Sequence, residues 1–352
     1  MINYQQHILR ENEEARTALR ILDKLSTSIS RTLFIVDATN KMVGSLSDGD
    51  IRRGLLNGLE ISVPVSSFMN NSFRFIRERE DNVEALKAYR LEDIKLIPLI
   101  NNEGHIVQIL DLRKTRTLLP VSALIMAGGK GERLRPYTDH VPKPMLKIGD
   151  KPIIEHTIDR LISFGISEIF ISVNYLKEQI ISYIGDGSSK GIQIHYIEES
   201  EPLGTLGALA LIPDIIHEDI LIINSDLLTN IDLEEFFQVY KTEGASMGIA
   251  SIPYQVDVPY AVLETKQNQV LSFIEKPSYT YYSNGGIYFM KSSLKANLAK
   301  GNFYNATDMM DNIISDESKK LVHYPVLGYW LDIGRHQDFI KAQEDIKHLS
   351  LY

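Results

Sequence analysis

Cysteine is absent from the sequence of 352 residues. This absence excludes disulfide bonds and thiolate metal sites, and it fits a reducing compartment, so we expect a cytoplasmic location. No apolar run approaches the roughly 18 residues of a membrane-spanning helix, so we expect no membrane partner. The polar and charged start, MINYQQHILRENEEART, does not have the pattern of a signal peptide.

Histidine patterns typical of a metal site or a nucleophile are also missing among the nine histidines. The net charge of −9 is unevenly placed, because residues 1–120 carry +1 and residues 121–352 carry −10. An acidic region repels a polyanion, so we expect no nucleic acid as partner. The length predicts two domains, and 44% hydrophobic residues suffice for a large core.

The most informative stretch that is present begins at a short apolar run, residues 123–126, which predicts a buried strand. Three glycines and two cations follow it: Gly128, Gly129, Gly131, Arg133 and Lys143. Glycines let the backbone approach a ligand and present successive N–H groups, which suits a phosphate. A strand end, a glycine loop and fixed cations together predict a cradle for a triphosphate.

This loop matches neither of two common phosphate-binding patterns. No Gly-Lys-Ser/Thr follows the glycines, which excludes a Walker A loop, and Leu134 stands where a dinucleotide fingerprint has its third glycine. The ordered set GGKGERLRP, PKPML and KPIIE instead resembles the sugar-1-phosphate nucleotidyltransferases. The resemblance covers about residues 121 to 350 and implies an enzyme that makes an NDP-sugar and pyrophosphate from an NTP and a sugar 1-phosphate.

Helix and strand patterns alternate after the loop, at residues 155–165, 168–175, 177–185 and 192–199. This alternation predicts an α/β domain, a Rossmann-like and mostly parallel sheet with helices on both faces. We place this nucleotidyltransferase domain at residues 120–352. The amphipathic pattern of residues 335–349 predicts a closing helix.

A second strong signal is Asp226, which follows the apolar run of residues 220–223. Open α/β sheets bind their ligands at the carboxyl ends of their strands, and a carboxylate there suits a hard cation. A single aspartate could equally be a turn residue. The resemblance adds Asp332, in the segment WLDIG, and implies Mg²⁺ as cofactor held by Asp226 and Asp332.

The resemblance also implies roles for the remaining motif residues. It implies that four residues act in catalysis: Arg133, Lys143, Asp226 and Asp332. It implies that the nucleotide is bound by Ala127, Gly128, Gly129, Gly131, Glu199, Gly204 and Thr205. Glu199 could accept hydrogen bonds from the two adjacent donors of guanine, with Gly204 letting the backbone approach the base. The alternative for residues 198–207 is a solvated acidic loop before a helix capped near Thr205.

Two further motifs point to the sugar. Residues 259–277 predict a β-hairpin with a polar turn at 266–269, which ends in Glu275-Lys276-Pro277. The resemblance implies sugar-phosphate binding by Glu275, Lys276 and, in the segment SNGGIY, Asn284. A solvated strand end is the alternative for the Glu-Lys pair. Ala261 stands where the family usually has glycine, which leaves the identity of the sugar open.

The N-terminal residues 1–119 contain an internal repeat of roughly 64 residues, RTLFIVDATNKMVGSLSDGDIRRGLL and IKLIPLINNEGHIVQILDLRKTRTLL. They resemble a pair of CBS motifs, a regulatory α+β domain that implies binding of AMP or ATP. In the first copy Ser47 and Asp50 match the family's ligand residues. The same spacing is equally typical of a capping box for the next helix. Asp111 and Lys114 break the pattern in the second copy, so we expect one nucleotide site at most.

The order of the domains resembles the glucosamine-1-phosphate guanylyltransferases of bacterial legionaminic-acid synthesis. This favours GTP and glucosamine 1-phosphate as substrates, in a homo-oligomer. Mannose- or heptose-1-phosphate guanylyltransfer is the nearest alternative, followed by thymidylyl or uridylyl transfer. A different class of function is a non-catalytic nucleotide sensor, but such a protein should have lost the cations or the acids that this chain retains.

Overall fold

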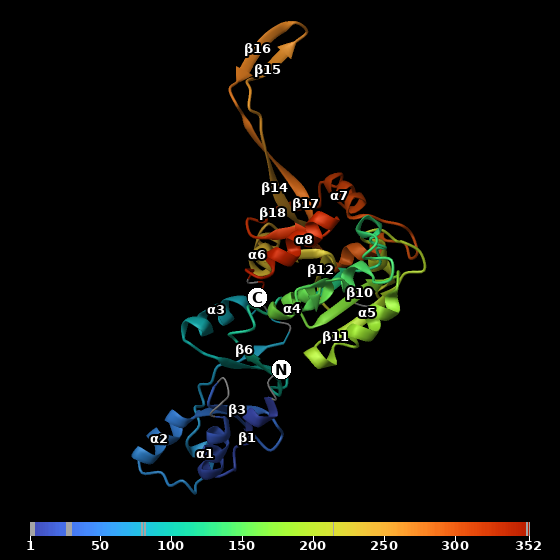
Figure 1. Ribbon diagram of the computed structural model, residues 1–352. Coiled ribbons are helices and arrows are strands. Elements are labelled where there is room, and N and C mark those ends of the chain that lie inside the picture. Colours follow the sequence, from blue (N-terminus) through green and yellow to red (C-terminus); the bar gives the residue numbers. More distant parts are fainter. Residues whose placement is uncertain are drawn as a thin grey trace. The chain divides into compact units, whose positions relative to one another are not determined.

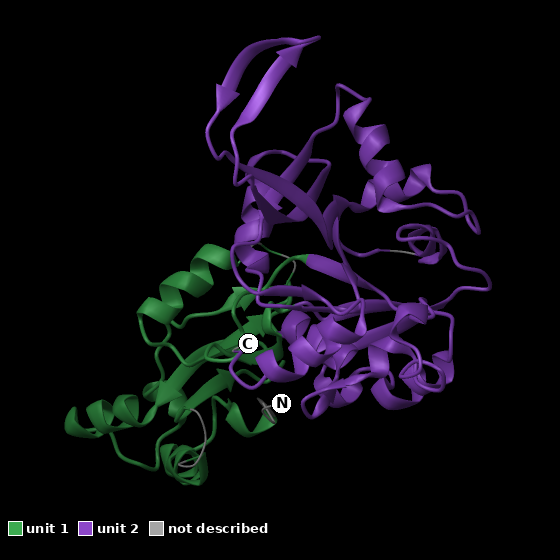
Figure 2. Ribbon diagram, turned by 45° about the horizontal axis from the view of Figure 1, so that its top comes forward, with its two compact units in different colours: residues 1–120, 163–165 green, residues 121–162, 166–352 purple. Residues whose placement is uncertain are grey.

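The computed structural model describes residues 4–25, 30–78, 80, 82–213, 215–349 and 351. The chain divides into two compact units (Figure 2). Unit 1 comprises residues 1–120 and 163–165, and unit 2 comprises residues 121–162 and 166–352. In the described part of the chain, every helix is too short or too polar to cross a bilayer.

Unit 2 is built on a seven-stranded sheet with the order β11-β10-β7-β12-β17-β14-β18 (Figure 1). The strands are β7 (Val121–Met126), β10 (Glu168–Val173), β11 (Gln193–Glu198), β12 (Asp219–Asn224), β14 (Met247–Asp257), β17 (Ser278–Lys291) and β18 (Leu321–Pro325). Neighbours pair in parallel except at β17, which is antiparallel to both β12 and β14. The mostly parallel α/β sheet predicted from the sequence is confirmed.

The burial of the central strands explains why they pair in parallel. All six residues of β10 are buried, as are five of six in β7 and in β12. Strands buried on both faces read as continuous apolar runs, and this is typical of parallel sheets covered by helices. Ile220 and Ile222 of β12 and Leu124 of β7 belong to one core cluster with residues of the segment before β12 and of helix α7 (Ala306–Ile314).

The other helices of unit 2 are α4 (Ile153–Ser163), α5 (Lys177–Ile184), α6 (Leu233–Thr242) and α8 (His336–Asp345). Helix α4 begins two residues before its predicted start. The chain turns after it at Gly165, whose φ of 74° favours glycine. The predicted closing helix is confirmed as α8.

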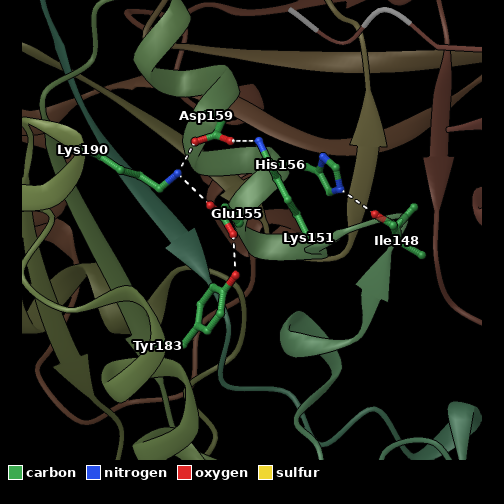
Figure 3. A network of polar contacts seen from close by, with 7 residues as sticks. All are labelled: Ile148, Lys151, Glu155, His156, Asp159, Tyr183 and Lys190. Carbon is green, nitrogen blue, oxygen red and sulfur yellow. Dashed lines mark hydrogen bonds and ion pairs between the residues drawn. The ribbon is translucent and has the colours of Figure 1, made fainter. Parts of the chain in front are cut away.

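A partly buried network of ion pairs and hydrogen bonds links helix α4 to the residues around it (Figure 3). Lys190 Nζ donates to Glu155 Oε1 at 2.8 Å and to Asp159 Oδ1 at 2.6 Å. Tyr183 OH of α5 donates to Glu155 Oε2 at 2.7 Å, and Lys151 Nζ donates to Asp159 Oδ2 at 2.7 Å. These bonds connect helices α4 and α5 with the segment before β11.

A long arm extends from the sheet of unit 2. Strands β14 and β17 run out of the sheet together and carry the hairpin of β15 (Val262–Lys266) and β16 (Gln269–Ile274) at their end (Figure 1). The predicted hairpin and its polar turn are confirmed. Its position at the end of an extended ladder was not predicted.

Unit 1 contains two sheets of the same topology, in the orders β1-β2-β3 and β4-β5-β6. In each, the first pair is parallel and the second is antiparallel. The elements are β1 (Ile8–Arg10), α1 (Ala15–Lys24), β2 (Thr32–Val36), β3 (Met42–Ser47) and α2 (Asp48–Leu56), then β4 (Ile76–Arg77), α3 (Val83–Leu91), β5 (Leu96–Ile100) and β6 (Ile106–Asp111). The internal repeat is confirmed, whereas its identity as a CBS pair stays a prediction.

Candidate active site

The glycine loop lies at the carboxyl end of the central strand β7, where an open parallel sheet places its ligands. A Cβ atom on Gly129 would meet nothing within 4 Å, so the backbone there faces open space. Gly131 has a φ of 64°, and a Cβ on it would lie 2.9 Å from Lys143 Cβ. The loop therefore needs glycine at residue 131 both for its conformation and to make room for Lys143.

The two acids predicted as metal ligands are neighbours. Asp226 follows β12, and the short strand β13 (Leu227–Thr229) pairs antiparallel with β19 (Trp330–Asp332). This pairing places Leu227 opposite Asp332, and the amide of Ile333 donates to the carbonyl of Asp226 at 3.0 Å. Main-chain pairing thus fixes the separation of the two carboxylates.

Lys143 lies between these acids. Its ammonium donates to Asp226 Oδ2 and lies 3.9 Å from Asp332 Oδ1. The Oδ1 atoms of both aspartates are buried without a hydrogen-bond partner. Burial and the neighbouring charge of Asp226 raise the pKa of Asp332, which Lys143 and Arg133 only partly offset. Lys143 and Arg133 therefore leave the charge of Asp332 incompletely compensated.

Arg133 lies at the exposed side of the same group. A Cβ on Gly334 would lie 3.6 Å from Arg133 Nη2 and 3.5 Å from Asp332 Oδ2. The guanidinium is therefore near Asp332 but remains accessible to a ligand. Ala127, by contrast, is buried, and its amide donates to the carbonyl of Ser172 at 2.9 Å in the sheet.

A cavity of 570 Å³ lies over this edge of the sheet. The predicted residues that line it are Gly128, Gly129, Lys143, Glu199, Gly204, Thr205 and Asp226. The sequence reasoning missed several polar residues that also line it, among them Asn174, Asn224 and Asn305. Asn174 directly follows β10 and Asn224 is the last residue of β12, so the rule that found Asp226 could have found them too.

Glu199 is held firmly at the wall of the cavity. Ser172 Oγ donates to its Oε1, and the amide of Leu203 donates to its Oε2 at 3.0 Å. Asn174 Nδ2 donates to its carbonyl oxygen at 2.7 Å. A Cβ on Gly128 would lie 3.0 Å from Glu199 Oε1, so this carboxylate borders the glycine loop directly.

The fold of the chain itself requires glycine at residue 204. Its φ is 75°, and a Cβ on it would lie 2.7 Å from the carbonyl oxygen of Tyr304. The close neighbour is therefore the chain before α7. Gly204 also lines the cavity, and its approach to a base stays a prediction. The alternative reading, a helix capped near Thr205, is wrong, because the chain forms a 3-10 helix, Gly207–Leu211, whose N-cap is Leu206 without a side-chain bond.

The predicted sugar-phosphate residues are separated in the structure. Asn284 lies on β17, and its Oδ1 accepts from the Gly286 amide and from Tyr288 OH, both at 2.9 Å. Glu275 and Lys276 lie on the arm between β16 and β17, where both are exposed, and they do not line the cavity of this chain. Lys276 has a φ of 43°, which is rare for a residue other than glycine.

Unit 1 has a polar cavity of its own, of 680 Å³, lined by Ser47, Asp50 and residues of both repeats. Asp50 Oδ2 accepts from the Ser47 amide at 2.8 Å and from Ser47 Oγ at 2.6 Å, and the Asp50 amide donates back to Ser47 Oγ at 3.3 Å. This capping box begins α2. In the second copy Asp111 bonds Arg113 instead, at 3.1 Å from its Nε.

Comparison with known proteins places the sequence in a family. A family model described as "Nucleotidyl transferase" matches residues 122–348. The "Probable mannose-1-phosphate guanylyltransferase 1" of Oryza sativa subsp. japonica is 33% identical over 231 residues, 62% of this chain and 63% of that protein. The "Mannose-1-phosphate guanylyltransferase" of Mycobacterium tuberculosis is 28% identical over 231 residues, 64% of each chain.

The fold also has solved relatives. A Bacillus anthracis protein named as a glucose-1-phosphate thymidylyltransferase matches with a TM-score of 0.54 and 22% identity, over 65% of this chain and 96% of its own. At this identity the likeness shows the fold alone. The match to the two guanylyltransferases spans less than two thirds of their lengths. The family model covers more than half of the chain, and the protein therefore belongs to the nucleotidyl transferase family.

Proposed function

We propose that the protein is a sugar-1-phosphate nucleotidyltransferase that joins an NTP, with GTP favoured, to a sugar 1-phosphate and releases pyrophosphate. The observation that carries this proposal is the convergence of the glycine loop, Lys143, Asp226 and Asp332 at one edge of the sheet. The amides of the glycine loop and the ammonium of Lys143 suit a polyphosphate, and the two acids with buried Oδ1 atoms suit a cation beside it.

The reaction needs no protein nucleophile. An oxygen of the sugar phosphate attacks the α-phosphorus, a new P–O bond forms, and the bond from the α-phosphorus to the bridging oxygen of pyrophosphate breaks. Catalysis then rests on positioning and on neutralising charge. The amides of the glycine loop and Arg133 hold the leaving β- and γ-phosphates, and Lys143 neutralises the charge that develops at the α-phosphate.

The acid pair fits a magnesium ion. In the described part of the chain, no three His, Cys, Asp or Glu side chains gather into a complete metal site. Asp226 and Asp332 instead offer two buried oxygens without hydrogen-bond partners. Hard oxygen donors suit Mg²⁺, which is usually held by one or two carboxylates together with substrate phosphates. When bound there, Mg²⁺ supplies charge neutralisation between the nucleotide and the sugar phosphate.

Guanine is supported by two observations. The relatives from rice and Mycobacterium tuberculosis are named for guanylyltransfer. Glu199 lies on the cavity wall with its carboxylate fixed by Ser172 and Leu203. Each carboxylate oxygen has a second lone pair, so Glu199 can still accept from the two adjacent donors of guanine.

Two sugars compete. The domain order favours glucosamine 1-phosphate, as in legionaminic-acid synthesis, whereas the relatives from rice and Mycobacterium tuberculosis are named for mannose 1-phosphate. Uridylyl and thymidylyl transfer are the further alternatives. We assign sugar-phosphate binding to Asn284, Glu275 and Lys276.

We further propose that unit 1 is a CBS pair that binds AMP or ATP in its 680 Å³ cavity. Ser47 and Asp50 line this cavity while they cap α2, so one pair of residues could perform both tasks. Calorimetric titration of AMP and ATP into the full chain tests this proposal. A heat signal that Asp50→Ala abolishes supports it, and the absence of heat from both nucleotides contradicts it.

The catalytic proposal is tested by pyrophosphate release from four NTPs, each combined with glucosamine, mannose and glucose 1-phosphate. We expect release only when an NTP and a sugar phosphate are both present, with GTP giving the highest kcat/KM. No release from any combination, together with nucleotide binding, would favour the non-catalytic sensor instead.

A further inference from the structure

Arg160 of α4 is a buried cation to which the proposed reaction gives no task. It is only 4% exposed, and it does not line the cavity of unit 2. Its Nη1 atom donates to the carbonyl of Leu351, and its Nη2 atom donates to the carbonyl of Ile231. A buried guanidinium is costly unless its donors are satisfied, so these bonds hold the side chain in place. Arg160 thereby joins two segments that are far apart in the sequence.

The bond to Ile231 holds one end of the ladder between β13 and β19, which brings the two catalytic acids together. Ile231 follows β13, and its amide donates to Thr229 Oγ1 at 3.1 Å. Thr229 pairs with Trp330 at this end of the ladder, and Leu227 pairs with Asp332 at the other end. An isolated two-stranded ladder is at best marginally stable. The geometry of this one therefore depends on what holds its end and what packs on it.

The side chain of Leu351 packs with residues of the same ladder. Leu351 is 4% exposed and belongs to one core cluster with Leu228 and Ile333. Leu228 is the middle residue of β13, and Ile333 directly follows Asp332. Protein interiors are packed as densely as organic crystals, so a side chain in such a cluster restricts the positions of its neighbours. Leu351 thus restricts the ladder from within the core, while Arg160 holds its end.

We propose that Arg160 and Leu351 are positioning residues for the acid pair. One guanidinium links Leu351 to the end of β13, and this Arg160 link keeps Asp226 and Asp332 at the spacing that a metal ion needs. The inference rests on the proposed function, because it takes the two aspartates as metal ligands. Neither Arg160 nor Leu351 lines the cavity, so both act through the ladder and touch no substrate. Residues that orient metal ligands in this way typically contribute about 10- to 100-fold to metal affinity or activity.

Binding of Mn²⁺ tests this inference without relying on turnover. Mn²⁺ accepts the same carboxylate ligands as Mg²⁺, and electron paramagnetic resonance counts the free ion. The parent, Arg160→Met and Arg160→Lys are titrated with Mn²⁺ beside a GTP analogue that cannot be cleaved. We expect Arg160→Met to raise the Kd for Mn²⁺ about 10- to 100-fold, and Arg160→Lys, which keeps the charge, to lie between Arg160→Met and the parent. Binding of the analogue in EDTA should stay parental, whereas a general disruption of the fold would weaken it too.

Leu351→Ala is the second variant, and Leu294→Ala is its matched control. Leu294 is 6% exposed and belongs to a different core cluster. Both substitutions remove the same atoms from a buried site, so both should lower the midpoint of thermal unfolding. Only Leu351→Ala should also weaken Mn²⁺ binding and lower kcat, because only this side chain packs with the ladder. These two variants decide the question if Arg160→Met does not fold.

The combined variant Arg160→Met/Leu351→Ala shows whether the two residues act together. Because they act through one link, we expect its Kd for Mn²⁺ to be close to that of Arg160→Met alone. Losses that multiply would overturn the inference, as would parental Mn²⁺ affinity in a folded Arg160→Met or an equal effect of Leu294→Ala and Leu351→Ala on Mn²⁺ binding. A parent that binds Mn²⁺ but releases no pyrophosphate contradicts the proposed function alone. A parent that binds no Mn²⁺ contradicts both.

Discussion

Lys143 lies between Asp226 and Asp332, donating to the first and standing 3.9 Å from the second. Each aspartate keeps a buried Oδ1 atom without a hydrogen-bond partner. The main chain fixes this arrangement, because Ile333, next to Asp332, donates its amide to the carbonyl of Asp226 at 3.0 Å. The site is thus built before a ligand arrives, as electrostatic catalysis requires.

Replacing Lys143 with methionine should lower kcat on the order of 10² to 10³ fold, the usual effect of removing one preorganised electrostatic contact. The side chain of Lys143 is only 11% exposed, so few solvent molecules can replace its charge. The measurement is steady-state pyrophosphate release. Lys147→Met, an exposed lysine four residues along the chain, is the matched control and should keep parental kcat. Equal rates for the two variants would contradict the role of Lys143.

Asp332→Asn should abolish activity and yet stabilise the metal-free protein by about 1 kcal/mol, because it removes one of two like charges that share a single lysine. Thermal unfolding with and without Mg²⁺ checks both parts of this expectation. Mg²⁺ should raise the midpoint of the parent, since a ligand that binds only the folded state stabilises it. An equal Mg²⁺ effect on Asp332→Asn would remove Asp332 from the metal site.

Gly129→Ala should weaken nucleotide binding, whereas Gly131→Ala should lower both stability and kcat. A Cβ on Gly129 meets nothing in the protein, so we expect unchanged stability and a raised KM for the NTP. At Gly131 the φ of 64° and the contact with Lys143 predict a loss of about 1 to 2 kcal/mol of unfolding free energy and a lower kcat. Chemical denaturation and initial rates separate these effects. An unchanged KM in Gly129→Ala would show that this glycine does not approach the nucleotide.

The network around Lys190 predicts a pH dependence of stability. Burial raises the pKa of Glu155, but hydrogen bonds from Lys190 and Tyr183 outweigh it, so its pKa lies below the ordinary 4.5. A lowered carboxyl pKa stabilises the fold above the unfolded pKa, and this stabilisation is lost as pH falls through the folded pKa. Lys190→Met should therefore lose about 2 kcal/mol at pH 7, and less below pH ~4.

Urea unfolding of Lys190→Met across this pH range makes the comparison, with the exposed Lys300→Met as control. A difference between Lys190→Met and the parent that stays constant down to pH ~3 would show that Glu155 is not the coupled group.

Glu199→Gln should reduce the preference for GTP over ATP by at least tenfold in kcat/KM, because the amide presents only one acceptor oxygen to the two guanine donors. Competition between the two nucleotides at fixed sugar phosphate gives this ratio directly. An unchanged ratio would move base recognition to another residue of the cavity wall.

The sequence predicted the parts of the site that follow a local rule. Gly128 and Asp226 each follow a buried apolar strand, so the edge of the sheet at which they meet could be inferred from order alone. Asp332 is different, because a pairing of two short distant strands brings it to Asp226. Nothing local in WLDIG indicates this pairing, and only the family resemblance suggested it.

For the arm, the sequence predicted the hairpin but not its position. Alternating apolar residues predicted the hairpin correctly, since periodicity reports strands. Periodicity does not report how far β14 and β17 stay paired before the hairpin begins, and this length decides where Glu275 and Lys276 lie. Gly204 gives a similar lesson, because a glycine in a motif indicates a special backbone without showing which neighbour requires it.

The most direct test of the account is pyrophosphate release from GTP and a sugar 1-phosphate by Asp226→Asn beside Asp311→Asn, an exposed aspartate of α7. We predict that Asp311→Asn keeps the parental rate and that Asp226→Asn loses at least 100-fold, with both variants folded. Parental turnover by Asp226→Asn would contradict the central claim that the paired aspartates form the catalytic centre.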